Sequence, residues 1–173
     1  MVTKIIRNSY WLVPGAILAG PFPGSDEEFA YKLRLRALYD AGIRAFINLQ
    51  QEGEMASSSR KYDEDYSKIF RNFLVQNNEK DIPGGFLKRF PILDRGIPSV
   101  EQMISILDEI DSLVSMNIRI YIHCWGGIGR TGTVVGCWLA RRGPCGREAL
   151  ERLNQLWLDC GRALTWPTTP ETD

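Results

Sequence analysis

The chain has 173 residues, and its 21 Lys and Arg residues balance its 21 Asp and Glu residues, so the formal net charge at pH 7 is zero. A chain of this length is the size of one domain, and it can bury about 70% of the surface that its unfolded form exposes. The balanced charge excludes the net basic field that is typical of nucleic-acid-binding proteins, and no apolar segment is long enough to span a bilayer. We therefore predict a single domain over residues 1–173, with a loose or truncated tail over 165–173, that binds neither nucleic acid nor membrane.

The cysteine pattern argues against a metal site and against a disulfide scaffold. The four cysteines include no C-x-x-C pair, and the chain has a single histidine, so the ligand spacing of a zinc site is missing. The apolar content of 44% suffices for an ordinary core, which makes stabilising disulfides unnecessary. The sequence predicts no metal and no cofactor. Its cysteines are Cys124, Cys137, Cys145 and Cys160.

The predicted elements alternate between strands and helices. In chain order the apolar patterns and turn residues predict strands over 10–13 and 16–19, a helix from Ser25 to about Gly42, a strand over 43–49, a helix over 62–73, a strand over 86–92, a helix over 99–116, a strand over 118–122 and helices over 131–140 and 147–160. This order is typical of an α/β fold with a central, mostly parallel sheet of about four or five strands flanked by helices.

Capping residues predict how two of these helices begin, and helical spacing predicts which side chains three of them bury. Ser25 with Glu28, and Ser99 with Gln102, have the spacing of capping boxes. The inward faces are predicted to hold Phe29, Leu33 and Ala37 in the first helix; Val100, Met103, Ile104, Leu107, Ile110 and Val114 in the third; and Ala149, Leu150, Leu153, Trp157 and Cys160 in the last.

The most informative segment, residues 123–132, reads His-Cys-Trp-Gly-Gly-Ile-Gly-Arg-Thr-Gly between a predicted strand and a predicted helix. Glycines allow the chain between Cys124 and Arg130 to curl so that successive backbone N–H groups point at one anion. The following helix directs its positive end at the same point. The segment therefore predicts a phosphate-binding loop with a thiol at its floor.

Each side chain of this loop suits one task in phosphoryl transfer. The nucleophile is the thiolate of Cys124, which the N–H groups and the helix N-terminus would stabilise. Arg130 offers a planar fork for two phosphoryl oxygens, and the Thr131 hydroxyl can donate a proton to the departing sulfur. His123 is predicted to orient the loop. The remaining phosphate-binding positions are Trp125, Gly126, Gly127, Ile128 and Gly129.

A purely structural reading of the same residues also exists. A single Cys after a strand is usually a small buried residue, and a single His is usually a core residue with its hydrogen bonds made. The coincidence of the placed Cys, Arg and three glycines favours the catalytic interpretation.

The loop resembles the signature of the cysteine-dependent protein tyrosine and dual-specificity phosphatases, which is His-Cys, five residues, Arg, then Ser or Thr. A second segment, residues 90–98 with the sequence Phe-Pro-Ile-Leu-Asp-Arg-Gly-Ile-Pro, resembles the general-acid loop of that superfamily. Within it, the two loops look most like those of the cyclin-dependent kinase-associated phosphatases. The resemblance extends in element order from about Ala37 to Thr165, although only the two loops are specific.

Asp94 is the acid that the second loop would carry. An acid opposite the nucleophile can protonate the leaving oxygen of a phosphate ester and later act as base toward water. Asp94 must be protonated while Cys124 is ionised, which predicts a bell-shaped dependence of rate on pH. Taken alone, the segment favours an ordinary turn that starts at Asp94, because Asp followed by Gly and Pro is common turn composition; the presence of Cys124 and Arg130 reverses this preference.

We therefore predict a phosphoprotein phosphatase that acts on phosphotyrosine, and on phosphoserine and phosphothreonine, through a cysteinyl-phosphate intermediate. The loop carries no charge between Cys124 and Arg130, which favours a monophosphate. Its partner would be a phosphorylated protein, and a thiolate nucleophile indicates a reducing, cytoplasmic location; the oligomeric state is left open. The alternatives are a phosphatase of the same superfamily acting on a phosphoinositide, a sugar phosphate or an RNA 5′ end, and a phosphate-binding module without catalysis.

Overall fold

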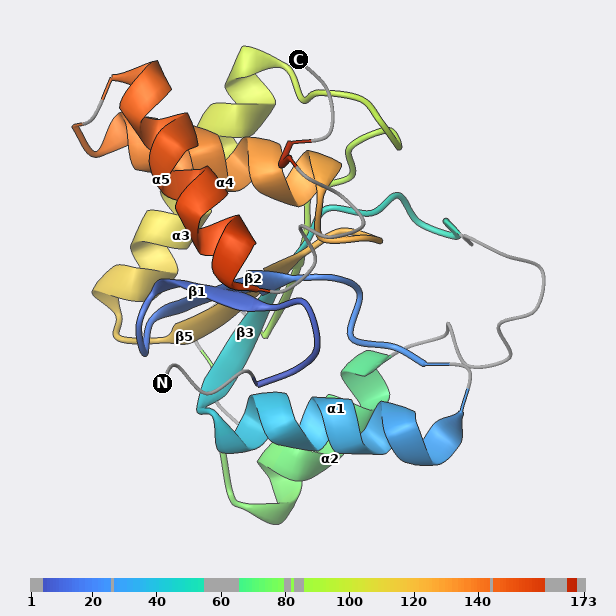
Figure 1. Cartoon of the computed structure of the whole chain (residues 1–173). Coiled ribbons are helices and arrows are strands. Elements are labelled where there is room, and N and C mark those ends of the chain that lie inside the picture. The colour runs from blue at the N-terminus through green and yellow to red at the C-terminus, as the bar shows by residue number, and fades with distance from the viewer. Residues whose placement is uncertain are drawn as a thin grey trace.

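The computed structural model describes residues 5–25, 27–54, 66–79, 82, 86–143, 145–160 and 168–170. These residues form one sheet of five strands covered by helices on both faces (Figure 1). The strands are β1 (Tyr10–Val13), β2 (Ile17–Gly20), β3 (Ile43–Asn48), β4 (Leu87–Arg89) and β5 (Arg119–His123). The α/β fold class and the number of strands agree with the sequence prediction.

The order of the strands across the sheet is β1-β2-β5-β3-β4. The edge strand β1 is antiparallel to β2, whereas β2, β5, β3 and β4 are all parallel. Strand β5 is central, with Ile120 opposite both Ile17 of β2 and Ala45 of β3. Because ligands of open α/β sheets bind at the carboxyl ends of the parallel strands, this arrangement places the segment after His123 at the functional edge of the sheet.

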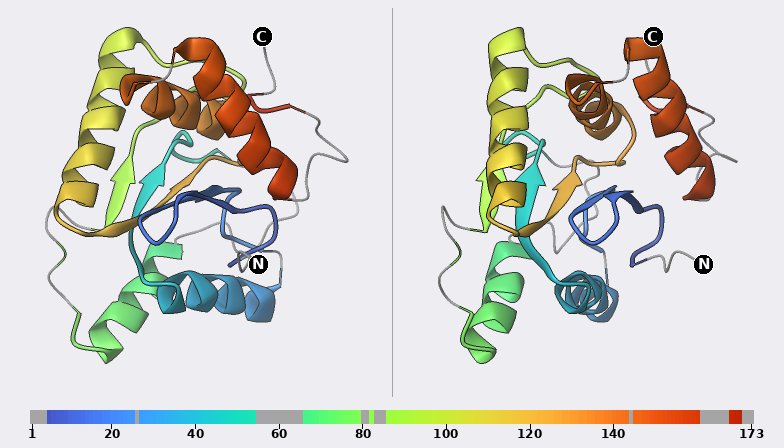
Figure 2. Two further views of the ribbon diagram at one scale, coloured as in Figure 1. Left: turned by 60° about the vertical axis from the view of Figure 1, so that its left-hand side comes forward. Right: turned by 90° about the vertical axis from the view of Figure 1, so that its left-hand side faces the viewer.

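The described residues also form five helices: α1 (Glu28–Asp40), α2 (Tyr66–Gln76), α3 (Val100–Ser115), α4 (Gly129–Arg141) and α5 (Gly146–Asp159). Helices α1 and α2 lie on one face of the sheet, and α3, α4 and α5 lie on the other (Figure 2). Alternate residues of β5 point to the two faces: Ile120 and Ile122 belong to the core under α3, α4 and α5, and Tyr121 belongs to the core under α1 and α2.

The prediction for the inward face of α1 was wrong at Phe29 and Leu33, although Ala37 does pack against the core. Phe29 and Leu33 are 75% and 53% exposed, whereas the helix buries Tyr31, Leu35, Leu38 and Tyr39 against the sheet. Apolar side chains occur on both sides of this helix, so helical spacing could not decide between the two. The aromatic contacts of Tyr39 with Phe70 and Phe73 of α2 decide it.

Two other faces were predicted in part. In α3, Leu107 and Ile110 are buried as expected, but Val100 and Ile104 are 71% and 49% exposed. In α5 the buried residues include Ala149, Leu153, Trp157 and Cys160, whereas Leu150 is 46% exposed. The three exceptions, Val100, Ile104 and Leu150, lie within the first five residues of their helices.

The two predicted capping boxes also differ from the structure. Helix α1 starts after Glu27, and the Ser25 hydroxyl accepts a hydrogen bond from Glu27 N without capping the helix. Ser99 does cap α3 by accepting from Gln102 N at 3.2 Å. The Gln102 side chain does not return to Ser99; it donates to the Pro91 carbonyl at 2.8 Å instead and so ties α3 to the loop that carries Asp94.

Residues 168–170 are the described part of the segment predicted to be a loose tail. Thr169 there is 2% exposed and packs against the start of α4, so the chain is held at this point; residues 165–167 and 171–173 lie outside the described part. Within the described ranges, no helix combines the length and the apolar character needed to cross a bilayer.

We predict that Leu35→Ala lowers the free energy of unfolding by about 2–5 kcal/mol, because it leaves a cavity in the core. Leu33→Ala, on the exposed side of the same helix, should change it by less than about 0.5 kcal/mol. Urea unfolding of both variants measures the difference. Equal losses would contradict the observed orientation of α1.

Candidate active site

The loop from Cys124 to Ile128 joins the carboxyl end of β5 to the amino end of α4. Cys124 is 3% exposed and lies at the floor of this loop, where its Sγ accepts a hydrogen bond from Gly127 N at 3.3 Å. The first N–H groups of α4 have no partner within the helix, so their positive ends face the same region. The predicted order of strand, phosphate-binding loop and buried helix is therefore present.

Three carbonyl groups of the loop are tied to groups outside it. The Cys124 carbonyl accepts from His123 Nδ1 at 3.1 Å, the Trp125 carbonyl from Phe22 N at 2.9 Å, and the Ile128 carbonyl from Thr169 Oγ1 at 2.8 Å. In a planar trans peptide the C=O and the following N–H point in opposite directions. Each contact that holds a carbonyl outward therefore turns the next N–H group inward.

Two glycines permit the close approach of other segments to the loop. Gly127 has φ +72°, and a Cβ there would lie 2.4 Å from the carbonyl carbon of Gly20. A Cβ at Gly132 would lie 2.2 Å from Thr169 Oγ1. Both positions therefore require glycine, the first for its backbone conformation as well.

The guanidinium of Arg130 is 2% exposed and has four acceptors. Nη1 donates to Glu54 Oε2 at 2.6 Å and to the Ile92 carbonyl at 3.1 Å, and Nη2 donates to Glu54 Oε1 at 2.6 Å and to Asp94 Oδ1 at 2.8 Å. Among the described residues, only its Nε–H lacks an acceptor. A phosphate that takes the edge formed by Nε and Nη2 must displace Asp94, while Glu54 can stay.

The loop that carries Asp94 is anchored on both sides of this residue. Ile92 N donates to the Leu49 carbonyl at 3.1 Å, and Gly96 N closes a turn on the Leu93 carbonyl at 2.8 Å. The side chain of Asp94 itself is 64% exposed. Asp94 can therefore leave Arg130 without breaking the loop, and the structure brings it to the same site as Cys124 and Arg130.

Glu54 was missed by the sequence analysis. It follows β3, which lies next to β5 in the parallel sheet, so its place at the functional edge could have been inferred once the strand order was known. Burial opposes the ionisation of Glu54, but the hydrogen bonds from Arg130 and Gln51 N outweigh it and lower its pKa. Burial likewise opposes the charge of Arg130, yet Glu54 and the charges of Cys124 and Asp94 raise the pKa of Arg130.

His123 is fully buried beneath the loop and is neutral. Burial lowers the pKa of His123 from its ordinary value of 6.5 to about 3. Because the Cys124 carbonyl only accepts, Nδ1 carries the single hydrogen, and Nε2 accepts from the Tyr66 hydroxyl at 2.9 Å. The structure thus adds Tyr66 of α2 as a partner of His123, and the orienting role of His123 stays a prediction.

Thr131 is fully buried in the first turn of α4. Its hydroxyl has no hydrogen-bond partner in the described part of the chain, so the contact with the Cys124 sulfur that the sequence suggested is not present here. A buried hydroxyl without a partner costs stability unless some other state of the site uses it. Its role as a proton donor stays a prediction.

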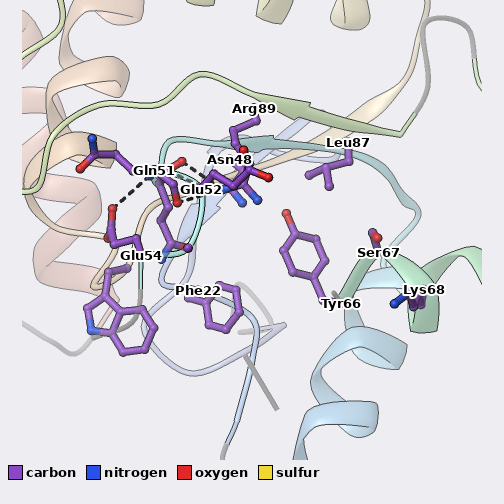
Figure 3. Close-up of a pocket in the computed structure, with 13 residues that line it drawn as sticks. Phe22, Asn48, Gln51, Glu52, Glu54, Tyr66, Ser67, Lys68, Leu87 and Arg89 are labelled. Carbon is purple, nitrogen blue, oxygen red and sulfur yellow. Dashed lines mark hydrogen bonds between the residues drawn. The ribbon is translucent and has the colours of Figure 1, made fainter. Parts of the chain in front are cut away.

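A cavity of about 580 Å³ opens beside the loop. Phe22, Tyr66 and Glu54 line it from three different elements (Figure 3). The rings of Phe22 and Trp125 stack at 5.6 Å between centroids and 17° between planes, and they form one wall. Trp125 thus supports the loop by packing and also lines the cavity, two roles that the sequence could not separate.

The arrangement can hold a tetrahedral anion above a sulfur nucleophile. Backbone N–H groups, the α4 N-terminus and Arg130 converge there, and Asp94 is within reach of the same anion. The described residues include no group of three or more His, Cys, Asp or Glu side chains placed to bind a metal ion. None of the four cysteines forms a disulfide in the structure.

Residues 25–144 match the Tc-R-P family, the DSP-PTPase phosphatase of polymorphic toxin systems. The chain is also 39% identical over 70 residues to the uncharacterized protein MJ0215 of Methanocaldococcus jannaschii, over 40% of this chain and 43% of that protein. The match spans less than half of that relative's length.

Solved structures share the fold. Tk-PTP in its active form superimposes with a TM-score of 0.61 at 23% identity, over 91% of this chain and 95% of that one. The kinase-associated phosphatase KAP, with its catalytic cysteine replaced by serine, gives a TM-score of 0.59 at 18% identity over 90% and 85%. At these identities the likeness establishes the α/β architecture and not a common substrate.

We predict that Thr169→Val weakens the binding of inorganic phosphate by about tenfold, because the Ile128 carbonyl loses a hydrogen bond that helps to direct Gly129 N–H inward. Thr169→Ser keeps the donor and should bind nearly as well as the original chain. Thr168→Val changes an exposed neighbour and serves as the control. Phosphate titration beside thermal unfolding tests this, and equal affinity of the Val and Ser variants would contradict it.

The low pKa of His123 predicts a loss of stability in acid. The unfolded state takes up the proton below pH 6.5, and the folded state resists it down to about pH 3, so unfolding becomes easier as the pH falls through this window. Between pH 7 and pH 5 the contribution is about 2 kcal/mol. In His123→Asn the difference in the free energy of unfolding between these two pH values should shrink by that amount, as urea unfolding can measure.

Proposed function

Because the chain belongs to the DSP-PTPase phosphatase family of polymorphic toxin systems, and is thus a phosphatase of the protein tyrosine and dual-specificity superfamily, we propose that it hydrolyses phosphorylated proteins through a cysteinyl-phosphate intermediate. The convergence of Cys124, Arg130 and Asp94 at the carboxyl end of β5 is the observation that supports this most strongly. The proposed substrates carry phosphotyrosine, and also phosphoserine or phosphothreonine.

In the first step the Cys124 thiolate attacks phosphorus, and the bond from phosphorus to the leaving oxygen breaks. The phosphoryl oxygens take the inward N–H groups of the loop and the Nε and Nη2 edge of Arg130, which displaces Asp94. Once it has left Arg130, Asp94 takes up a proton from solvent and gives this proton to the leaving oxygen. Glu54 keeps its two hydrogen bonds to Arg130 throughout and holds the fork in plane.

In the second step Asp94 takes a proton from water, and the water oxygen attacks phosphorus as the bond from sulfur to phosphorus breaks. The departing thiolate needs a hydrogen-bond donor, and we assign this to the Thr131 hydroxyl in the first turn of α4, which has no partner among the described residues. One water is consumed, and inorganic phosphate leaves. Neutral His123 keeps the Cys124 carbonyl outward in both steps.

The finer assignments are part of the proposal. Likeness to the kinase-associated phosphatases rests on the two loops and on the shared fold. The uncharged lining of the loop between Cys124 and Arg130 supports a monophosphate, and its thiolate supports a reducing, cytoplasmic location. The alternative substrates are a phosphoinositide, a sugar phosphate and an RNA 5′ end. Measuring phosphate release from each of them beside the phosphopeptides decides among these substrate classes.

We predict that the Cys124→Ser variant releases no phosphate from phosphopeptides but still binds them. Serine lacks the thiolate, whereas the conformation of the loop and its N–H groups are retained. Denaturing mass spectrometry of the original enzyme during turnover should detect a phosphate on Cys124. If no trapped intermediate carries phosphate on this sulfur, or if a chelator stops the reaction, the mechanism is wrong.

Asp94→Asn should lower kcat on phosphopeptides by about 10²–10⁴-fold, because the leaving oxygen loses its acid. The original enzyme should have a bell-shaped dependence on pH, and the variant should lose the alkaline limb, which reports the protonated acid. Asp40→Asn, at the exposed end of α1, is the matched control. An unchanged alkaline limb in Asp94→Asn would assign the proton transfer elsewhere.

A further inference from the structure

A second cavity, of about 280 Å³, adjoins the phosphate-binding loop on the other side of the stacked rings of Phe22 and Trp125. Both rings line this cavity and the larger one, so they form the wall between the two. Gly126, two residues after Cys124, also lines the smaller cavity. A substrate whose phosphate lies above Cys124 can therefore extend into it past a residue without a side chain.

The smaller cavity contains two arginines, Arg7 and Arg34, and its described lining includes no carboxylate. Neither arginine forms an ion pair with a described residue. Nη1 of Arg34 donates to the Gly24 carbonyl, a neutral acceptor, so this contact orients the guanidinium and no described carboxylate pairs with its charge. We call this cavity, with Arg7, Arg34, Trp125 and Gly126, the arginine pocket.

The larger cavity, described above, differs from the arginine pocket in the charge of its lining. Its lining combines Lys68 and Arg89 with Glu52 and Glu54, so cations and carboxylates balance there. Arg89 also donates to the carbonyls of Gln50 and Gln51, each at 3.1 Å. An additional negative group on the substrate therefore gains more in the arginine pocket than in the larger cavity.

We propose that the arginine pocket binds a second anionic group of the substrate, a phosphate or a carboxylate close in sequence to the phosphorylated residue. This inference rests on the proposed function and specifies its substrate class: phosphoprotein segments with a neighbouring acidic or second phosphorylated side chain. A flexible peptide can pass around the aromatic wall, whereas the phosphates of an inositol ring are held rigidly together and would need charges inside the loop, which has none between Cys124 and Arg130.

The test compares phosphopeptides that differ by one side chain. A glutamate, a glutamine or a second phosphate is placed at each neighbouring position in turn, and kcat/KM is measured for each peptide. The original enzyme should prefer the glutamate or doubly phosphorylated peptide by about three- to tenfold, the range expected of partly exposed charge pairs. High salt should reduce the preference. The glutamate and phosphate series distinguish the two sources of charge.

Arg7→Gln and Arg34→Gln should each reduce this preference, and Arg34→Lys should restore part of it. Arg36→Gln is the matched control, because Arg36 is on the same helix as Arg34, is exposed and pairs with Asp40 outside the pocket. It removes the same charge and should leave the preference intact. An equal loss of preference in Arg36→Gln and Arg34→Gln would show a general field effect and overturn the proposal.

Two further outcomes separate this inference from the proposed function. If the original enzyme hydrolyses p-nitrophenyl phosphate but shows no preference among the peptides, the arginine pocket is wrong and the phosphatase mechanism stands. If it hydrolyses neither, the proposed function fails, and titration of the peptides into Cys124→Ser still tests the pocket by binding. The same arginine variants are also assayed on vesicles that contain phosphoinositides. If Arg7→Gln and Arg34→Gln lower hydrolysis of these vesicles but leave the peptide preference unchanged, the pocket binds a lipid headgroup and the proposal is overturned.

Discussion

The active site depends on the outward direction of the carbonyl groups in the loop after Cys124. Amide N–H groups converge on one point only if their partners on the other side of each peptide face away. Three separate segments make this happen: Phe22 N after β2, His123 at the end of β5, and Thr169 near the C-terminus. The loop itself is contiguous, but its conformation is held by the adjacent His123 and by two residues far from it in sequence, Phe22 and Thr169.

The difference between the local loop and its distant contacts explains which parts of the site could be predicted from the sequence. Cys124, Arg130 and the glycines between them form one local pattern, and a strand before it with a helix after it can be inferred from short-range periodicity. The contacts of Phe22, Glu54 and Thr169 are set by the order of the strands and by the path of the chain end. Single-sequence patterns carry no information on such distances, so these residues emerged only from the fold.

The prediction of which helix faces are buried from the sequence has a related limit. The positions of α3, α4 and α5 follow from their apolar runs, and their buried centres were predicted correctly. The orientation of α1 was not, because Phe29 and Leu33 offer one apolar stripe and Leu35 and Leu38 another. Packing against α2 selects the second stripe. Local hydrophobicity predicts that a helix forms, whereas the partner surface decides which side it buries.

The ion pairs of Arg130 bear on how the charge of the substrate is balanced. Glu54 already matches the single positive charge of Arg130 through two hydrogen bonds of 2.6 Å. In the proposed mechanism phosphate displaces Asp94 and the arginine fork supplies direction and donors, but little net charge remains to neutralise a dianion beside a thiolate. His123 is neutral and adds none. The stabilisation must therefore come mainly from the peptide dipoles of the loop and the N-terminus of α4. This makes the geometry of the outward carbonyls, and so the contacts of Phe22, His123 and Thr169, as important to the chemistry as the reacting side chains.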